Sequence, residues 1–199
     1  MLTDKIEEYK IILASGSPRR QQFFKDLHIP FEIRLKEVDE IYPDSLKAAE
    51  ISDYLAVLKA SPLKDELVEN EILITSDTVV WHNMESLAKA SNGNEAYEML
   101  RKLSGEWHQV ITSVCFTTSE KQTIVNHTTK VKFKELSDKE IWYYIDNYKP
   151  FDKAGAYGIQ EWIGLIAIEK IEGSYTNVVG LPTQVVYDTI NKLISQSKK

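Results

Sequence analysis

The chain has 199 residues, of which 43% are hydrophobic and 27% charged, and its formal net charge is −6. This size allows one substantial core, or two small lobes around a cleft. The net negative charge argues against a non-specific binder of nucleic acid or of an anionic membrane, so an anionic ligand would need a local basic pocket. The sequence contains no run of about 18 apolar residues that would span a membrane. Because the N-terminus is polar and Cys115 has no partner for an internal disulfide, we expect a cytoplasmic protein.

Strands and helices alternate in the first half of the chain. Ser17 followed by Pro18 predicts a helix start, because serine is a good N-cap and proline a good first helical residue. Residues 47–60 have the apolar spacing of a helix. The other expected elements are strands at 11–13, 31–38 and 71–81, and a turn at 82–85.

The second half continues the alternation. Ser137 and Glu140 form a capping-box pattern, which predicts a helix start. The other expected elements are a helix at 94–103 ending at Gly105, strands at 109–117, 123–135 and 165–171, a Gly/Ala-rich loop at 151–160 and a last helix at 182–195.

This order of elements favours an α/β or mixed α+β architecture. The sequence shows no internal repeat and no low-complexity linker. We therefore expect a single domain over 1–199, with a core at about 10–195. Its two lobes would share a twisted mixed sheet, flanked by helices, with a deep central cleft.

Two groups of carboxylates stand out. Asp77 interrupts an apolar strand, where an ionised carboxylate needs a partner. It is either a general base or metal ligand in a cleft, or an ordinary aspartate that caps backbone or faces solvent. Glu37, Asp39 and Glu40 follow a predicted strand and suit Mg²⁺ or Mn²⁺, although a solvated acidic loop is the more ordinary explanation of this cluster by itself.

Several cations have two interpretations as well. Arg19 and Arg20 lie in the first turn of a helix, where their charge opposes the helix dipole. Free helix N–H groups and guanidinium forks at such an end suit phosphate oxygens. Lys59, Lys89 and Lys153 are either surface lysines or side chains that reach the same cleft.

Together these groups favour metal-assisted hydrolysis of a phosphoanhydride. They supply carboxylates for a metal, one semi-buried acid for water, and cations for phosphates. The sequence lacks the Walker A, GxGxxG, HExxH, GxSxG and paired CxxC patterns.

A more specific signal comes from six segments in order: "LASGSPRRQQFF" (13–24), "SDT" (76–78), "MLRKLSGEWHQVIT" (99–112), "KELSDKEIWYYI" (134–145), "DKAGAYGIQ" (152–160) and "IEGSYTNVVGLP" (171–182). Over about residues 10–190 they resemble the Maf family of nucleotide pyrophosphatases. The resemblance implies a house-cleaning enzyme, linked to arrest of cell division. It would hydrolyse nucleoside triphosphates to the monophosphate and pyrophosphate with a divalent metal, Mg²⁺ or Mn²⁺.

The resemblance also implies roles for residues. Asp77 matches the proton acceptor, and Ser15, Arg20, Lys59 and Lys89 match positions that bind substrate or phosphate. Glu40 also matches a position that lines the site, and we expect it to hold the metal together with Asp77. Arg19, Thr78 and Gln160 match the branch that prefers dTTP and UTP, so we expect them to determine specificity.

Three departures from the family pattern bear on substrate choice. Thr75 precedes Ser76, "AKA" at 88–90 replaces "GKP", and Glu161 and Trp162 follow Gln160 where the family has glycine after the glutamine. A charge and a large ring beside Gln160 are expected to affect base selectivity.

Two other functions stay open at this point. One is a pyrophosphatase for the purine nucleotides ITP and XTP, and the other is a non-catalytic, nucleotide-binding regulator of septation. The expected partner is a nucleoside triphosphate, without nucleic acid or membrane, and both a monomer and a homodimer are compatible with the sequence.

Overall fold

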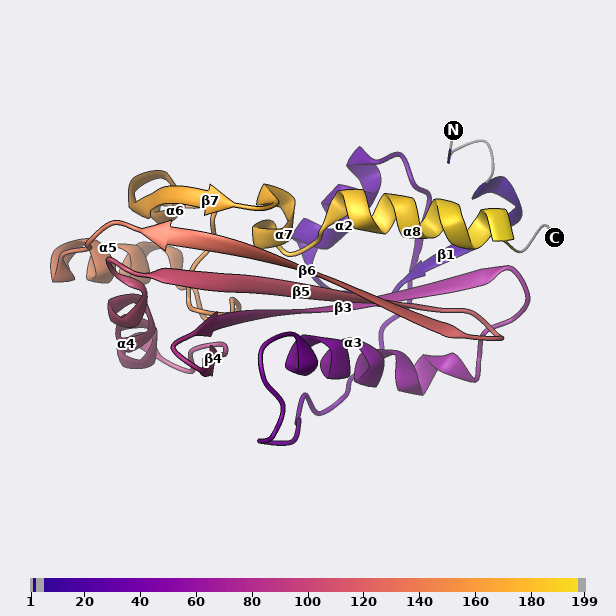
Figure 1. The fold of residues 1–199 in the computed structure, drawn as a ribbon, viewed down its shortest axis with the longest axis horizontal. Helices are drawn as coiled ribbons and strands as arrows, with labels where there is room; N and C mark the ends of the chain where they lie inside the picture. Colours follow the sequence, from indigo (N-terminus) through magenta and orange to yellow (C-terminus); the bar gives the residue numbers. More distant parts are fainter. Residues whose placement is uncertain (1, 3–5, 197–199) are drawn as a thin grey trace.

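The computed structural model describes residue 2 and residues 6–196 (Figure 1). The strands are β1 (Lys10–Leu13), β2 (Glu32–Ile33), β3 (Glu71–His82), β4 (Glu85–Leu87), β5 (Trp107–Thr117), β6 (Gln122–Phe133) and β7 (Ile168–Glu172). The helices are α2 (Pro18–Asp26), α3 (Ala49–Lys64), α4 (Gly93–Leu103), α5 (Asp138–Tyr148), α6 (Trp162–Ala167), α7 (Tyr175–Val179) and α8 (Thr183–Gln196), with a 3-10 turn, η1, at Ile6–Glu8. The mixed α/β class is thus confirmed.

One seven-stranded sheet runs through the molecule. Its order is β2-β1-β3-β5-β6-β7, and β4 pairs with β3. The strands β3, β5 and β6 are long and antiparallel, whereas β1 is parallel to β2 and β3. The three long strands therefore form a spine that reaches from one end of the molecule to the other (Figure 1).

Helices cover both faces of this spine and make two lobes. The helix α3 lies on one face, and α2 and α8 lie on the other (Figure 1). One apolar cluster packs around α4, α5 and α6 and includes Leu100 and Tyr144. A second cluster packs β1, α2 and α8 and includes Phe24 and Ile190. These two larger clusters are the cores of the two lobes, and two smaller clusters pack α3 against β1 and β3.

A gap in the sheet separates the lobes along one edge of β3. β1 pairs with β3 only as far as Ile74, and β4 pairs with it only from Val80 onward. In the described part of the chain, no strand pairs with this edge over residues 75–79. The polar triplet Ser76, Asp77 and Thr78 lies in this gap, which explains how a polar stretch is accommodated inside an apolar strand.

The structure confirms the predicted helix ends. The Ser137 and Glu140 capping box is present at the start of α5. Ser17 caps α2 and is followed by Pro18 in its first turn. Gly105 follows α4 with a φ of +73°, a left-handed conformation that glycine adopts without strain.

The strand predicted over 31–38 is wrong beyond its first residues, because only Glu32 and Ile33 pair with β1. β1 ends at Leu13, so residues after 34 have no neighbouring strand to pair with. Leu35 is 57% exposed, although the alternating pattern predicts a buried residue. The rest of the segment is a loop that carries Glu40 into the gap.

The strand predicted over 165–171 is wrong in its first half. Residues 162–167 form the helix α6, which buries Ile163 and Ala167 one helical turn apart. A short apolar run does not distinguish a buried helix face from a buried strand. The short elements β4 and α7 were not predicted. No helix in the described part of the chain combines the length and the apolar character needed to cross a membrane.

Candidate active site

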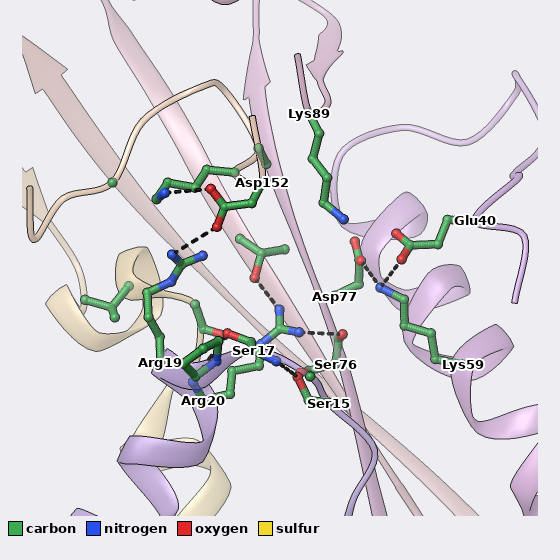
Figure 2. Close-up of a pocket in the computed structure, with 18 of the residues that line it drawn as sticks. Ser15, Ser17, Arg19, Arg20, Glu40, Lys59, Ser76, Asp77, Lys89 and Asp152 are labelled. Carbon is green, nitrogen blue, oxygen red and sulfur yellow. Dashed lines mark hydrogen bonds and ion pairs between the residues drawn. The ribbon is translucent and has the colours of Figure 1, made fainter. Parts of the chain in front are cut away.

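The gap in the sheet opens into a cavity of about 900 Å³ (Figure 2). The start of α2, the loop at 35–40, α3, β3 and the segment at 152–161 line it. Its lining contains six basic and six acidic side chains: Arg19, Arg20, Lys36, Lys59, Lys89 and Lys153, and Glu37, Asp39, Glu40, Asp77, Asp152 and Glu161. A cavity of this size holds a nucleotide-sized ligand.

Asp77 is the most buried of these acids that face the gap, with 6% of its surface exposed. Its Oδ1 accepts a 2.6 Å hydrogen bond from Nζ of Lys59 on α3. The same ammonium lies 3.2 Å from Oε1 of Glu40 (Figure 2). Two carboxylates therefore share one lysine, so the buried Asp77 charge is paired while one negative charge of the group is left over. The structure brings together the three residues that the sequence singled out separately.

The same carboxylates fit a divalent cation. Glu40 and Asp77 converge on one positive group, the ammonium of Lys59. Mg²⁺ is commonly bound by one or two carboxylates, with water and substrate phosphates completing its shell. No group of three acidic, histidine or cysteine side chains suited to a metal occurs among the described residues. The donor set thus suits a cation that arrives with phosphate better than one held by protein alone.

The start of α2 forms a second wall of the cavity. Ser17 Oγ accepts a hydrogen bond from the backbone N–H of Arg20, at 3.5 Å. The buried Ser15 hydroxyl accepts one from the backbone N–H of Ser17, at 3.3 Å. These bonds fix the turn into the helix, and they place its positive end beside the cavity.

Arg20 is held by three protein acceptors. Its Nε, Nη1 and Nη2 donate to the carbonyl of Gly180 (2.9 Å), the carbonyl of Ser76 (3.0 Å) and the hydroxyl of Thr78 (3.0 Å). Three of the five guanidinium N–H groups are thereby used, and two are left for a ligand. Burial lowers the pKa of Arg20, against the opposing effect of the Asp77 charge. The guanidinium is therefore a rigid donor that joins α2, β3 and the end of α7.

Thr78 supports this arrangement. Its hydroxyl also makes a 2.9 Å hydrogen bond with Thr112 of β5. Thr112 in turn donates to the carbonyl of Asn177, at 3.2 Å. Thr78 lines the cavity, but the structure shows its hydroxyl engaged with Arg20. Its part in substrate specificity stays a prediction.

Arg19, Lys89 and Gln160 project from different elements toward the cavity. Arg19 Nη1 lies 3.7 Å from Oδ2 of Asp152, across the mouth of the cavity (Figure 2). The side chain of Lys89 extends toward Asp77, and its ammonium makes no hydrogen bond or ion pair with the described residues, whereas its backbone bridges to Ala154. Gln160 is exposed and lines the cavity. All nine residues expected at the site therefore lie around one cavity, although their roles remain predictions.

Sequence reasoning missed the side chains that support the segment at 152–161. Tyr144 and Asp152 were not identified as site residues, and Lys153 was left ambiguous. The motif "DKAGAYGIQ" was the available signal for Asp152 and Lys153. Tyr144 carried no such signal, because its spacing on α5 indicates only a core residue.

The fold is similar to that of a HAM1 protein from Coxiella burnetii, with a TM-score of 0.51 at 10% identity, covering 92% of this chain and 99% of that one. This likeness concerns the fold alone. It agrees with the mixed α/β architecture described above.

The chain is much more similar in sequence to a second group of proteins than to the HAM1 protein. Residues 10–193 match the family model described as Maf-like protein. A protein of Flavobacterium johnsoniae named dTTP/UTP pyrophosphatase is 60% identical over 194 residues, which cover 98% of this chain and 100% of that protein. One of Christiangramia forsetii with the same name is 55% identical over 195 residues, which cover 98% and 100%. The chain belongs to the Maf family.

Proposed function

We propose that this protein hydrolyses dTTP and UTP to the nucleoside monophosphate and pyrophosphate. The observation that carries the proposal is the group of Asp77, Lys59 and Glu40 in a nucleotide-sized gap of the sheet. The names of the relatives at 60% and 55% identity support the choice of substrate. A nucleoside triphosphate substrate and the free thiol of Cys115 both suit a protein that works in the cytoplasm.

Asp77 is the general base in this proposal. Its carboxylate takes a proton from the water whose oxygen attacks the α-phosphorus. The bond from that phosphorus to the bridging oxygen of the β-phosphate breaks, and pyrophosphate leaves with the bonding electrons. Lys59 holds the Asp77 carboxylate at a fixed position through the 2.6 Å hydrogen bond.

Glu40 and Asp77 would hold the divalent cation. When bound, such a cation neutralises phosphate charge and makes the attacking water more acidic. The lining itself supports this requirement, because its six basic and six acidic side chains leave no formal positive charge to balance a triphosphate. We therefore expect activity to require Mg²⁺ or Mn²⁺.

The remaining cations bind the phosphates. Lys89 projects into the cavity, and its ammonium is available to the leaving pyrophosphate. Arg20 offers two N–H groups from a rigid position, beside the N-terminus of α2. Arg19 and Gln160 both line the cavity and are left to contact the nucleoside, and an amide suits the donor and acceptor pattern of uracil or thymine.

The test is a pyrophosphate-release assay over the common nucleoside triphosphates together with ITP and XTP. We expect dTTP and UTP to be preferred with Mg²⁺ or Mn²⁺, and EDTA to abolish turnover. Preference for ITP and XTP would instead favour the purine pyrophosphatase. Binding of UTP without pyrophosphate release would favour the non-catalytic regulator.

The Asp77→Asn variant tests the base. We expect kcat to fall by about two to four orders of magnitude, the usual contribution of a general base. Asp65→Asn is a matched control, because Asp65 is an exposed aspartate at the end of α3, away from the cavity. If Asp77→Asn keeps the activity of the control, Asp77 is not the base.

A further inference from the structure

A chain of alternating charges leads from the mouth of the cavity into the protein. Arg19 pairs with Asp152 at 3.7 Å, and Asp152 Oδ1 accepts a 2.7 Å hydrogen bond from Lys153 Nζ. Lys153 also lies 3.0 Å from Glu161 Oε1. Glu161 Oε2 then accepts a hydrogen bond from the hydroxyl of Tyr144. Four charged side chains therefore end on one buried phenol.

Glu161 is the fixed end of this chain. One of its carboxylate oxygens forms an ion pair with Lys153, and the other accepts a hydrogen bond from Tyr144. Burial, followed by the hydrogen bond to Glu161, raises the pKa of Tyr144, so its phenol stays protonated and donates. The hydroxyl also accepts a 3.0 Å bond from the backbone N–H of Gly158. A Cβ on Gly158 would lie 2.8 Å from Cδ of Glu161, so the loop closes tightly around this carboxylate.

The two departures from the family pattern at 161 and 162 point away from direct contact with a base. Both carboxylate oxygens of Glu161 are occupied. The ring of Trp162 packs on Tyr143 of α5, with a centroid distance of 4.8 Å. We therefore expect these residues to affect substrate choice through the segment that they hold.

Loss of the Glu161 charge would change the ion pairing of Arg19. The side chain of Lys153 is 10% exposed and lies between two carboxylates. Without Glu161, Lys153 has only Asp152 to compensate it, and the pair must rearrange. Asp152 is the partner of Arg19, and Gln160 is the residue before Glu161. A change at Glu161 therefore reaches both of the predicted specificity residues.

We propose that Glu161, anchored by Tyr144 and Lys153, is a positioning residue that sets Gln160 and Arg19 for recognition of the nucleoside. The proposal rests on the proposed function, because it requires that these two side chains contact the substrate. It assigns a role to a residue that lines the cavity but whose carboxylate is engaged by Lys153 and Tyr144.

The experiment compares Glu161→Gln, Tyr144→Phe, the double variant and Glu169→Gln in the full chain. Glutamine keeps the shape and an acceptor for Tyr144 but removes the charge that faces Lys153. Glu169 is an exposed glutamate on β7, and its variant is the matched control. Steady-state kcat and KM are measured for UTP, dTTP and CTP, with thermal unfolding of each variant. The dissociation constant of UTP is measured in an Asp77→Asn background, where turnover does not interfere.

We expect Glu161→Gln to raise KM and the dissociation constant for UTP by about three- to tenfold, a loss of up to about 1.4 kcal/mol. The value of kcat should stay within about twofold, and preference for UTP over CTP should fall, because orientation rather than chemistry is affected. Tyr144→Phe should change KM in the same direction. Since Tyr144 acts through Glu161, the double variant should be no worse than the more affected single variant.

Three results would overturn the proposal. They are an unchanged KM and substrate preference in Glu161→Gln, a loss confined to kcat, and additive effects in the double variant. If Glu161→Gln does not fold, Tyr144→Phe decides by the same criteria. If the wild-type protein hydrolyses UTP and Glu161→Gln has the same KM and substrate preference, this proposal is rejected and the proposed function stands. A wild-type protein that neither binds nor hydrolyses dTTP or UTP rejects the proposed function as well.

Discussion

Lys59 shows how single residues make the cavity possible. Its ammonium compensates Asp77, whose side chain is 9% exposed, and Glu40. Removing one partner of a buried pair leaves an uncompensated charge, whereas replacing both partners with neutral groups costs much less. We therefore expect Lys59→Met to lower the free energy of unfolding by about 3 kcal/mol. Urea denaturation measures this, and the double variant Lys59→Met/Asp77→Asn should regain part of the loss. Equal stability of Lys59→Met and wild type would contradict the pairing.

His108 is a second residue whose burial has a measurable consequence. Its Nε2 lies 2.8 Å from the Tyr157 hydroxyl, and burial lowers its pKa to about 3. An imidazole in the unfolded chain titrates near pH 6.5. Below that pH the unfolded state binds a proton that the folded state does not, so stability falls as the pH falls toward 3. At pH 5 this contribution amounts to about 2 kcal/mol, relative to pH 7.5.

The His108→Gln variant should lose this part of the pH dependence. Denaturant titrations between pH 5 and 7.5 compare it with wild type and with His28→Asn. His28 is exposed and has a φ of 54°, a conformation that asparagine tolerates. The control should keep the slope of wild type. An equal slope in His108→Gln would show that other groups cause the loss of stability.

Among the elements, the helix α5 begins at a capping box that the sequence predicts, and it carries a side chain that supports the site. Its capping box is complete, and the helix carries Tyr144 to Glu161. Loss of a serine cap costs about 1 kcal/mol, so Ser137→Ala should lower the free energy of unfolding by about that amount. Ser119→Ala, in the exposed turn between β5 and β6, is the control and should leave stability unchanged. If both variants match wild type, the cap contributes nothing to the folded state.

Elements were predictable from the sequence where their determinants are local. The caps at Ser17 and Ser137 are set by neighbours within three residues. The strand at 31–38 was overestimated because its length depends on where β1 ends, which the segment itself does not encode. The helix α6 was misread because an apolar run fits both a strand and a buried helix.

The candidate site divides in the same way. Residue types at Asp77 and Arg20 and the family motifs indicated which side chains belong to it. The hydrogen bond from Arg20 to Gly180 joins residues 160 positions apart, and no local pattern predicts it. The anchoring of Glu161 by Tyr144 likewise depends on how α5 packs against the segment at 152–161.

At the scale of the whole molecule, two apolar clusters share one sheet. The cluster around α4, α5 and α6 contains Val110 of β5 and Val131 of β6, and the cluster around α2 and α8 contains Val114 and Phe116 of β5. Continuous pairing of β3, β5 and β6 passes through both. Unfolding one lobe would therefore break hydrogen bonds and packing in the other.

We accordingly expect the chain to unfold as one domain, in a single cooperative transition. Differential scanning calorimetry should give one peak, with equal calorimetric and van't Hoff enthalpies. Tryptophan fluorescence and far-UV circular dichroism should report the same midpoint, because the fluorescence samples Trp162 beside the cluster around α4, α5 and α6 and Trp81 beside α3, whereas the dichroism samples the whole sheet. Binding of UTP with Mg²⁺ should raise that midpoint without splitting the peak, since the cavity is built from both lobes. Two separate transitions would mean that the lobes are independent folding units joined by the strands.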